Sequence, residues 1–296
     1  MPKRLCVGVS LVLLGLVAGP GPGCGKKQER HSGAADADGR RPASILMRPV
    51  PNEAGLIFVD GFESGKLDRW SFRWLRRRKS ARIVSSPVRF GRRALEISLR
   101  RNDPMFSKGK RSELQVPGHY ALGQAYWYGF SMFLPADWKE DFRAEVLAQW
   151  FATRDEALGE RPRSPSLALR IKKKHWFVTY RYDRKRLSVA NTAPKGKVYK
   201  TPYRRGVWTD WVFHVRWSAG DDGLTRVWKD GQLVATRKGP NTYNDAVGPV
   251  LKLGIYKAPW NKPEARSAVS SRLLYLDEVR VGTAKAGYAG VAPPRK

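Results

Sequence analysis

The stretch VLKLGIYKAP, residues 250–259, has the alternation of a β-strand near the end of the chain. Successive side chains of a strand point to opposite faces of a sheet. One face of this strand is apolar and consists of Leu251, Leu253 and Ile255. The other face carries Lys252, Gly254 and Tyr256. This second face therefore has a cation, a residue without a side chain and a phenol in a row. Such a combination suggests a functional surface on the open side of the sheet.

Similar runs recur from residue 55 onward, and helical periodicity is scarce. The Asp230-Gly231 pair predicts a tight hairpin. The pattern predicts an all-β fold of two packed antiparallel sheets, a β-sandwich of the jelly-roll (concanavalin A-like) type with a concave substrate groove. The strands are predicted at residues 55–60, 93–100, 110–116, 125–134, 144–151, 166–172, 175–182, 211–217, 225–236, 249–256 and 271–282.

The N-terminal region predicts export. A basic start precedes an apolar run at residues 6–19, which is too short to cross a bilayer and fits a secretory signal. Cys24 follows small residues and predicts a lipid anchor, with simple signal cleavage as the alternative. The expected protein is a monomer, either an envelope lipoprotein of a bacterium or secreted. The predicted segments are a signal peptide at 1–23, a flexible tether at 24–54, one jelly-roll domain at 55–282 and a disordered tail at 283–296.

The formal net charge of +30 favours a polyanionic partner. An exported protein meets acidic polysaccharides and anionic lipids more readily than nucleic acid. RNA-binding motifs with interleaved aromatic residues are absent from the sequence, so no specific nucleic acid partner is expected. A coding bias toward arginine, without functional meaning, is the alternative. Signal cleavage leaves one cysteine, which excludes an internal disulfide.

Three more predicted strands combine an apolar face with polar side chains on the other. Arg111 and Glu113 share one such face, Gln149 lies on a second, and His214 and Arg216 share a third. For any single strand an ordinary solvated face explains the pattern equally well. Together, the polar faces are consistent with a concave sheet that carries a binding groove.

Four segments in this order resemble polysaccharide lyases with the jelly-roll fold: RSEL (111–114), WYGFSMFLPADW (127–138), QWF (149–151) and LKLGIY (251–256). FVDGFESGKLDRW (58–70) and LLYLDEVRVG (273–282) also resemble that group. The nearest families are the heparin lyase I-like and glucuronan lyases, with alginate lyases more distant. The resemblance implies β-elimination on a uronic acid polymer that is glucuronan, heparin-like or alginate-like. A base removes the C5 proton and an acid protonates the departing O4.

The resemblance also implies roles for individual residues. Arg111 and Gln149 would neutralise the substrate carboxylate, which stabilises the enolate-like charge as it develops. Tyr256 would be the catalytic tyrosine, with Lys252 adding positive charge beside it. Gly254 would keep the floor of the groove open to a sugar ring.

The general base is less defined. Many relatives have a histidine two residues after the glutamine, where this chain has Phe151. Either Tyr256 acts as both base and acid, or His119 or His214 is the base. His119 is preferred because it follows the strand of Arg111. The remaining alternative is a non-catalytic carbohydrate-binding sandwich on the bacterial envelope.

No cofactor is required for this chemistry. A structural calcium ion is the one metal expected, held by carboxylates near the two ends of the domain, namely Asp60, Glu63 and Asp277. The groove should also include a set of substrate-binding side chains. This set is Lys252, Glu113, His214, Arg216, Lys257, Trp260 and Tyr243.

Overall fold

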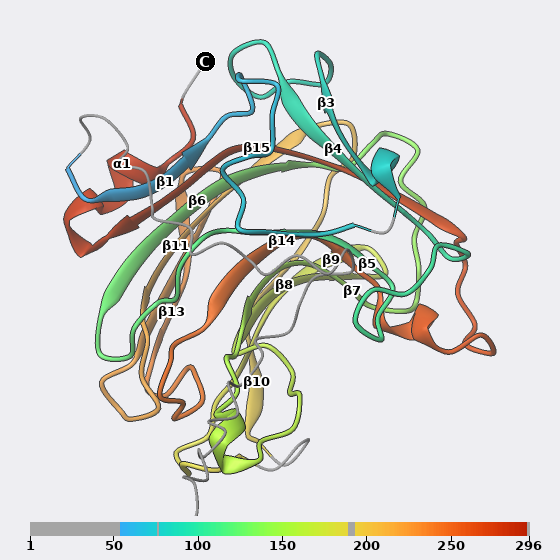
Figure 1. Ribbon diagram of the computed structural model, residues 1–296. Coiled ribbons are helices and arrows are strands. Elements are labelled where there is room, and N and C mark those ends of the chain that lie inside the picture. The colour runs from blue at the N-terminus through green and yellow to red at the C-terminus, as the bar shows by residue number, and fades with distance from the viewer. Residues whose placement is uncertain (1–53, 76, 189–192, 295–296) are drawn as a thin grey trace, which may run out of the picture. The chain divides into compact units, whose positions relative to one another are not determined.

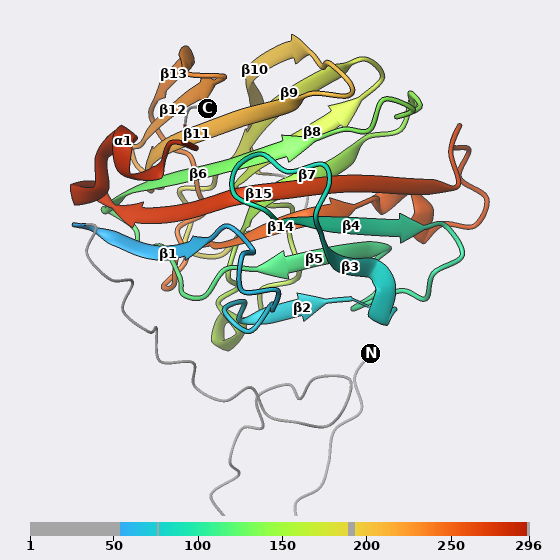
Figure 2. The same ribbon diagram turned by 90° about the horizontal axis from the view of Figure 1, so that it is seen from above.

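The computed structural model describes residues 54–75, 77–188 and 193–294. The predicted signal peptide, the anchor at Cys24 and nearly all of the tether lie outside the described residues and stay predictions. Within the described part, two antiparallel sheets pack face to face, which confirms the predicted β-sandwich (Figures 1 and 2). None of the helices in the described part is both long and apolar enough to cross a membrane.

The first sheet has eight strands in the order β13-β12-β11-β6-β15-β4-β3, with β1 also paired to β15. Figure 2 shows β1, β15 and β6 side by side. The strands of this sheet are β1 (Leu56–Asp60), β3 (Ala81–Val84), β4 (Ala94–Arg100), β6 (Ala125–Phe133), β11 (Trp208–Arg216), β12 (Leu224–Lys229), β13 (Gln232–Lys238) and β15 (Ser271–Thr283).

The second sheet, called here the groove sheet, has seven strands in the order β10-β9-β8-β7-β14-β5-β2. The two sheets bend together, with the groove sheet on the inner side of the bend (Figure 1). Its strands are β2 (Phe72–Trp74), β5 (Arg111–Gln115), β7 (Glu145–Phe151), β8 (Leu167–Lys172), β9 (His175–Arg181), β10 (Lys195–Pro202) and β14 (Val250–Tyr256).

The core between the sheets is rich in aromatic residues. Trp150 on β7 lies 4.7 Å from Phe213 on β11, and Trp176 on β9 lies 5.5 Å from Trp211, measured between ring centroids. All four side chains are fully buried. Because truncating a buried aromatic side chain to alanine costs about 3–5 kcal/mol, these contacts hold the groove sheet firmly against its partner. Because side chains alternate along a strand, the polar side chains of the groove sheet point away from the core and toward the concave side of the bend.

Some local predictions need correction. The run 225–236 is two strands joined at Asp230-Gly231, whose positive φ angles of 50° and 84° confirm the hairpin turn. β2, β3 and β10 were not predicted. The predicted disordered tail is wrong for residues 283–294, because a 3₁₀ turn, Ala284–Ala286, leads into helix α1, Gly287–Val291. Val291 is fully buried against the eight-stranded sheet, where its carbonyl packs closely over Gly129.

Candidate active site

Three neighbouring strands bring three of the predicted catalytic residues, Arg111, Gln149 and Tyr256, to one face of the groove sheet. β14 lies between β5 and β7. In the ladder, Tyr256 is opposite Arg111, and Lys252 is opposite Gln149. Residues opposite one another in a sheet place their side chains on the same face. The face is the one turned away from the core, since Leu251, Leu253 and Ile255 fill the interior.

The Glu113 carboxylate connects these residues. The amide nitrogen of Gln149 donates a hydrogen bond to Glu113 Oε1, and Arg111 Nη1 lies 3.5 Å from Glu113 Oε2. The guanidinium of Arg111 in turn stacks 4.4 Å from the centre of the Tyr256 ring. Glu113 and Gln149 are each only 1% exposed. The structure therefore brings together Arg111, Gln149 and Tyr256. Glu113, which was predicted only as a substrate contact, joins Gln149 to Arg111.

Lys252 occupies an aromatic cage beside this group. Its ammonium lies 4.1 Å from the ring centre of Trp74 and 4.4 Å from that of Phe151. Burial lowers the pKa of Lys252 to about 8, although Glu113 acts in the opposite direction. Phe151 is thus one wall of a cation–π site. Trp74, the other wall, was missed because its three-residue strand is too short to show a pattern.

The hydroxyl of Tyr256 is positioned by Asn261, a residue that no sequence pattern indicated. Asn261 Nδ2 donates to Tyr256 Oη at 3.4 Å, and Asn261 Oδ1 accepts from the backbone N–H of Lys110 at 2.7 Å. The loop before β5 packs closely here, because a Cβ at Gly109 would lie 3.0 Å from the Tyr256 ring. Asn261 therefore ties the phenol to this loop.

Gly254 has a structural reason that differs from the predicted one. Its φ of 137° is strained for residues with a side chain, and a Cβ there would lie 2.3 Å from the carbonyl oxygen of Ser112. The ladder between β14 and β7 also shifts register between Leu253 and Tyr256. Glycine is required here by the close approach of the β5 backbone, and the predicted role in opening the groove floor to a sugar stays a prediction.

Lys257 and Trp260 are buried and do not form the groove rim, which corrects their assignment to substrate binding. Lys257 is fully buried and its ammonium lies 2.8 Å from Asp141 and 2.7 Å from Glu145. Burial opposes ionisation of Asp141, but hydrogen bonds from Lys257 and Ser267 outweigh it and lower its pKa to about 2. Trp260 is 2% exposed and donates to Ser267 Oγ at 3.0 Å. This network anchors the end of β14 directly after Tyr256.

Tyr243 is also buried, at 2% exposure, and donates to the carbonyl of Ser164 at 3.0 Å, so it is no stacking platform. His119 is exposed, with Nδ1 3.1 Å from Thr153 Oγ1 and 3.2 Å from the carbonyl of Gly248. These contacts place it near the start of β14. Because a strand rises about 3.3 Å per residue, the two ends of β14 are about 20 Å apart. His119 is therefore not beside Tyr256.

His214 and Arg216 lie on the other sheet. They belong to β11, where Phe213 and Val215 face the core, so both point to the outer face of the eight-stranded sheet. His214 stacks on Trp127 with 4.1 Å between ring centroids, and Arg216 pairs with Asp222 at 3.0 Å. Neither reaches the groove, so their predicted roles as base and substrate contact are wrong.

The carboxylates proposed for calcium have other partners. Asp60 accepts from the backbone N–H of Phe62 at 2.8 Å, and Asp277 accepts from those of Arg89 and Glu278 at 2.9 and 2.8 Å. The exposed Glu63 accepts from the N–H groups of Arg92 and Arg93. Within the described residues these three carboxylates do not form a group close enough to share a metal ion.

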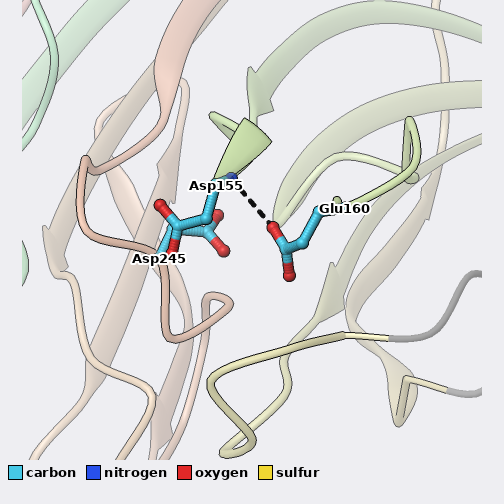
Figure 3. A group of neighbouring side chains, drawn as sticks. All are labelled: Asp155, Glu160 and Asp245. Carbon is cyan, nitrogen blue, oxygen red and sulfur yellow. Dashed lines mark hydrogen bonds between the residues drawn. The ribbon is translucent and has the colours of Figure 1, made fainter. Parts of the chain in front are cut away.

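A different acidic group occurs among the described residues: Asp155, Glu160 and Asp245, with ligand atoms within 4.8 Å of one another (Figure 3). Arg163 lies 2.5 Å from Glu160 and 2.8 Å from Asp245, and Arg186 lies 2.9 Å from Asp155. These two guanidinium groups supply the positive charge that such a group needs. The cluster is thus explained as an ion-pair network that holds the loops after β7 and before β14.

The fold and site together define a β-sandwich protein with a cluster of polar and basic side chains on the concave side of one sheet. The chain belongs to the polysaccharide lyase family, whose model matches residues 62–280. No curated protein matches the sequence.

Among solved structures, the chain is similar to an endo-β-1,4-glucuronan lyase from the fungus Trichoderma reesei, with 22% identity and a TM-score of 0.69. That match covers 83% of this chain and 100% of the other. The cellulose-induced protein Cip1 matches with 11% identity and a TM-score of 0.51, over 76% of this chain and 96% of the other. At these identities the likenesses confirm the fold.

Proposed function

We propose that this polysaccharide lyase cleaves a uronic acid polymer by β-elimination, with Tyr256 as the proton-transferring residue. The observation that carries the proposal is the convergence of Arg111, Gln149 and Tyr256 on one face of the groove sheet. Family membership supports lyase chemistry. The glucuronan lyase acts on a polyuronate, and its fold likeness supports the same substrate class here.

Arg111 and Gln149 are arranged to hold a carboxylate, since both already contact that of Glu113. The Arg111 side chain is 11% exposed, and the Gln149 amide has a second N–H. In the proposed complex the guanidinium and this N–H bind the substrate carboxylate. Its neutralisation lets negative charge develop next to C5, which is the largest obstacle to removing the C5 proton.

Tyr256 then serves both proton transfers on one face of the sugar. Its phenolate takes the C5 proton, the C5–H electron pair forms the C4=C5 bond, and the C4–O4 bond breaks. The phenol returns the proton to O4 of the departing chain, which regenerates the phenolate. Arg111 lies over the ring. Its positive charge favours the negative charge that this cycle places on the phenol oxygen.

The experiment is an assay of the full-length protein against a panel of uronate polymers, including glucuronan, heparin and alginate. We expect products that absorb in the ultraviolet because a new C4=C5 double bond is conjugated to the carboxylate. Mass spectrometry should show these products lighter by one water than those of hydrolysis. Cleavage without the double bond, or no cleavage of any polymer, would refute β-elimination.

A non-catalytic binding protein is the second candidate function. Phe151, one wall of the cage around Lys252, favours it because a phenyl ring transfers no proton. This candidate predicts that polymers are retained on affinity gels without being cleaved. The same panel separates the two, because only a lyase generates the ultraviolet signal.

A further inference from the structure

One end of the groove sheet carries a concentration of positive charge that the reaction does not use. Cross-strand pairing places Lys195 opposite Arg181 and Lys200 opposite Phe177, while Arg170 is opposite Phe177 from the other side. We call Arg170, Arg181, Lys195, Lys197 and Lys200 the basic end of the groove sheet. All five side chains share the face that carries Tyr256, because Leu169, Ile171, Trp176 and Val178 fill the core side of the same strands.

These cations lack acidic partners. Within the described residues, no carboxylate lies within 4.0 Å of any cation of the basic end. Like charges directly opposite each other destabilise a sheet, as in the pair of Lys195 and Arg181. Burial, followed by the nearby charge of Arg181, lowers the pKa of Arg170 to about 10. The fold therefore carries repulsion that a bound anion would relieve.

An aromatic ring lies among these cations. Lys197 Nζ is 5.5 Å and Lys200 Nζ is 5.9 Å from the centre of the half-buried Phe177 ring. An apolar face flanked by ammonium groups suits a sugar ring that bears anionic substituents. Lysines on an edge strand such as β10 also prevent aggregation between sheets. That purpose does not explain Arg170 and Arg181, which lie on the interior strands β8 and β9.

The number of charges limits the kind of polymer. Adjacent strands are about 4.8 Å apart, so the basic end spans about 10 Å across β8, β9 and β10, and Lys195 and Lys200 lie about 16 Å apart along β10. A short sugar chain bound over this area brings one carboxylate per sugar if it is not sulfated. Sulfate groups on the same sugars add further anions, which matches five clustered cations better. We propose that the basic end of the groove sheet binds sulfate groups, so that the substrate is a sulfated uronic acid polymer. This inference rests on the proposed function.

The test compares glucuronan with the same preparation after chemical sulfation, at one ionic strength. The variant is Lys197→Gln/Lys200→Gln. The matched control is Lys79→Gln/Lys285→Gln, which removes equal charge from exposed lysines beside the eight-stranded sheet. We expect wild type and control to show a KM about tenfold lower for the sulfated polymer. The groove variant should lose that preference.

Binding is measured separately by retention of the Tyr256→Phe protein on gels containing either polymer. Retention that depends on sulfate and on Lys197 and Lys200, without cleavage, would support the sulfate site while refuting the lyase proposal. Cleavage of both polymers with equal KM would support the lyase proposal and refute the sulfate site. If both double variants bind the sulfated polymer equally more weakly than wild type, the attraction is non-specific. If the groove variant aggregates but keeps its preference for the sulfated polymer, the lysines protect the sheet edge. Either result would overturn the sulfate site.

Discussion

Lys252 gives the prediction that depends most directly on the geometry of the site. Its side chain is 3% exposed and its pKa of about 8 lies below the 10.5 of an ordinary lysine. Each pKa unit corresponds to about 1.4 kcal/mol, so keeping the ammonium charged in its cage costs on the order of 3 kcal/mol relative to the unfolded chain. Lys252→Met keeps the length of the side chain and removes the charge.

The direction in which stability changes with pH follows from proton binding at Lys252. Between pH 8 and 10.5 the unfolded chain binds more protons at this residue than the folded protein does, so stability rises with pH in that window. The penalty is complete below about pH 8 and absent above 10.5. The free energy of unfolding of wild type minus that of Lys252→Met should therefore be constant below pH 8. Above pH 8 it should rise by up to about 1.4 kcal/mol per pH unit.

The assay is urea denaturation of both proteins by tryptophan fluorescence, from pH 6 to 10 at fixed salt. Other titrating groups are common to both chains and cancel in the difference. A difference that stays flat through pH 10 would show that the ammonium is solvated, and would refute the cage between Trp74 and Phe151. A difference that falls with rising pH would mean that the charged form is stabilised by folding.

Three further predictions concern neighbouring positions. Asn261→Ala should lower kcat by about tenfold with little change in KM, because the phenol of Tyr256 loses its positioning contact; an unchanged kcat would contradict that role. Lys257→Met should cost about 3–5 kcal/mol in urea denaturation because it leaves the buried Asp141 without its cation and Glu145 with Arg272 alone; a cost below 1 kcal/mol would count against the network. His119→Ala should keep the wild-type rate of product formation, since the imidazole is near the far end of β14; a large loss would restore it as the base.

Alternation along 250–256 was enough to predict which residues face the groove. It identified Lys252 and Tyr256 correctly, and similar patterns placed Arg111 and Gln149 on the same surface. Alternation shows which side chains share a face, but not which sheet the strand joins. For that reason His214 was placed in the groove although β11 belongs to the other sheet.

Other features depend on tertiary contacts that leave no local pattern. Lys257 follows Tyr256 directly, yet the chain turns there into a short 3₁₀ helix and buries the lysine against two carboxylates. Asn261 becomes a partner of Tyr256 only through that turn. β10 was missed because an edge strand rich in lysine lacks the apolar face by which strands are recognised, and only its pairing with β9 makes it extended.

The most direct test of the account is the rate at which Tyr256→Phe generates unsaturated product from the polymer that the wild type cleaves best. The substitution removes one oxygen and keeps the ring against Arg111. We expect a loss of about a thousandfold or more, since one residue performs both proton transfers, with circular dichroism and urea stability close to wild type. A folded Tyr256→Phe protein that cleaves at the wild-type rate would contradict the proposed mechanism.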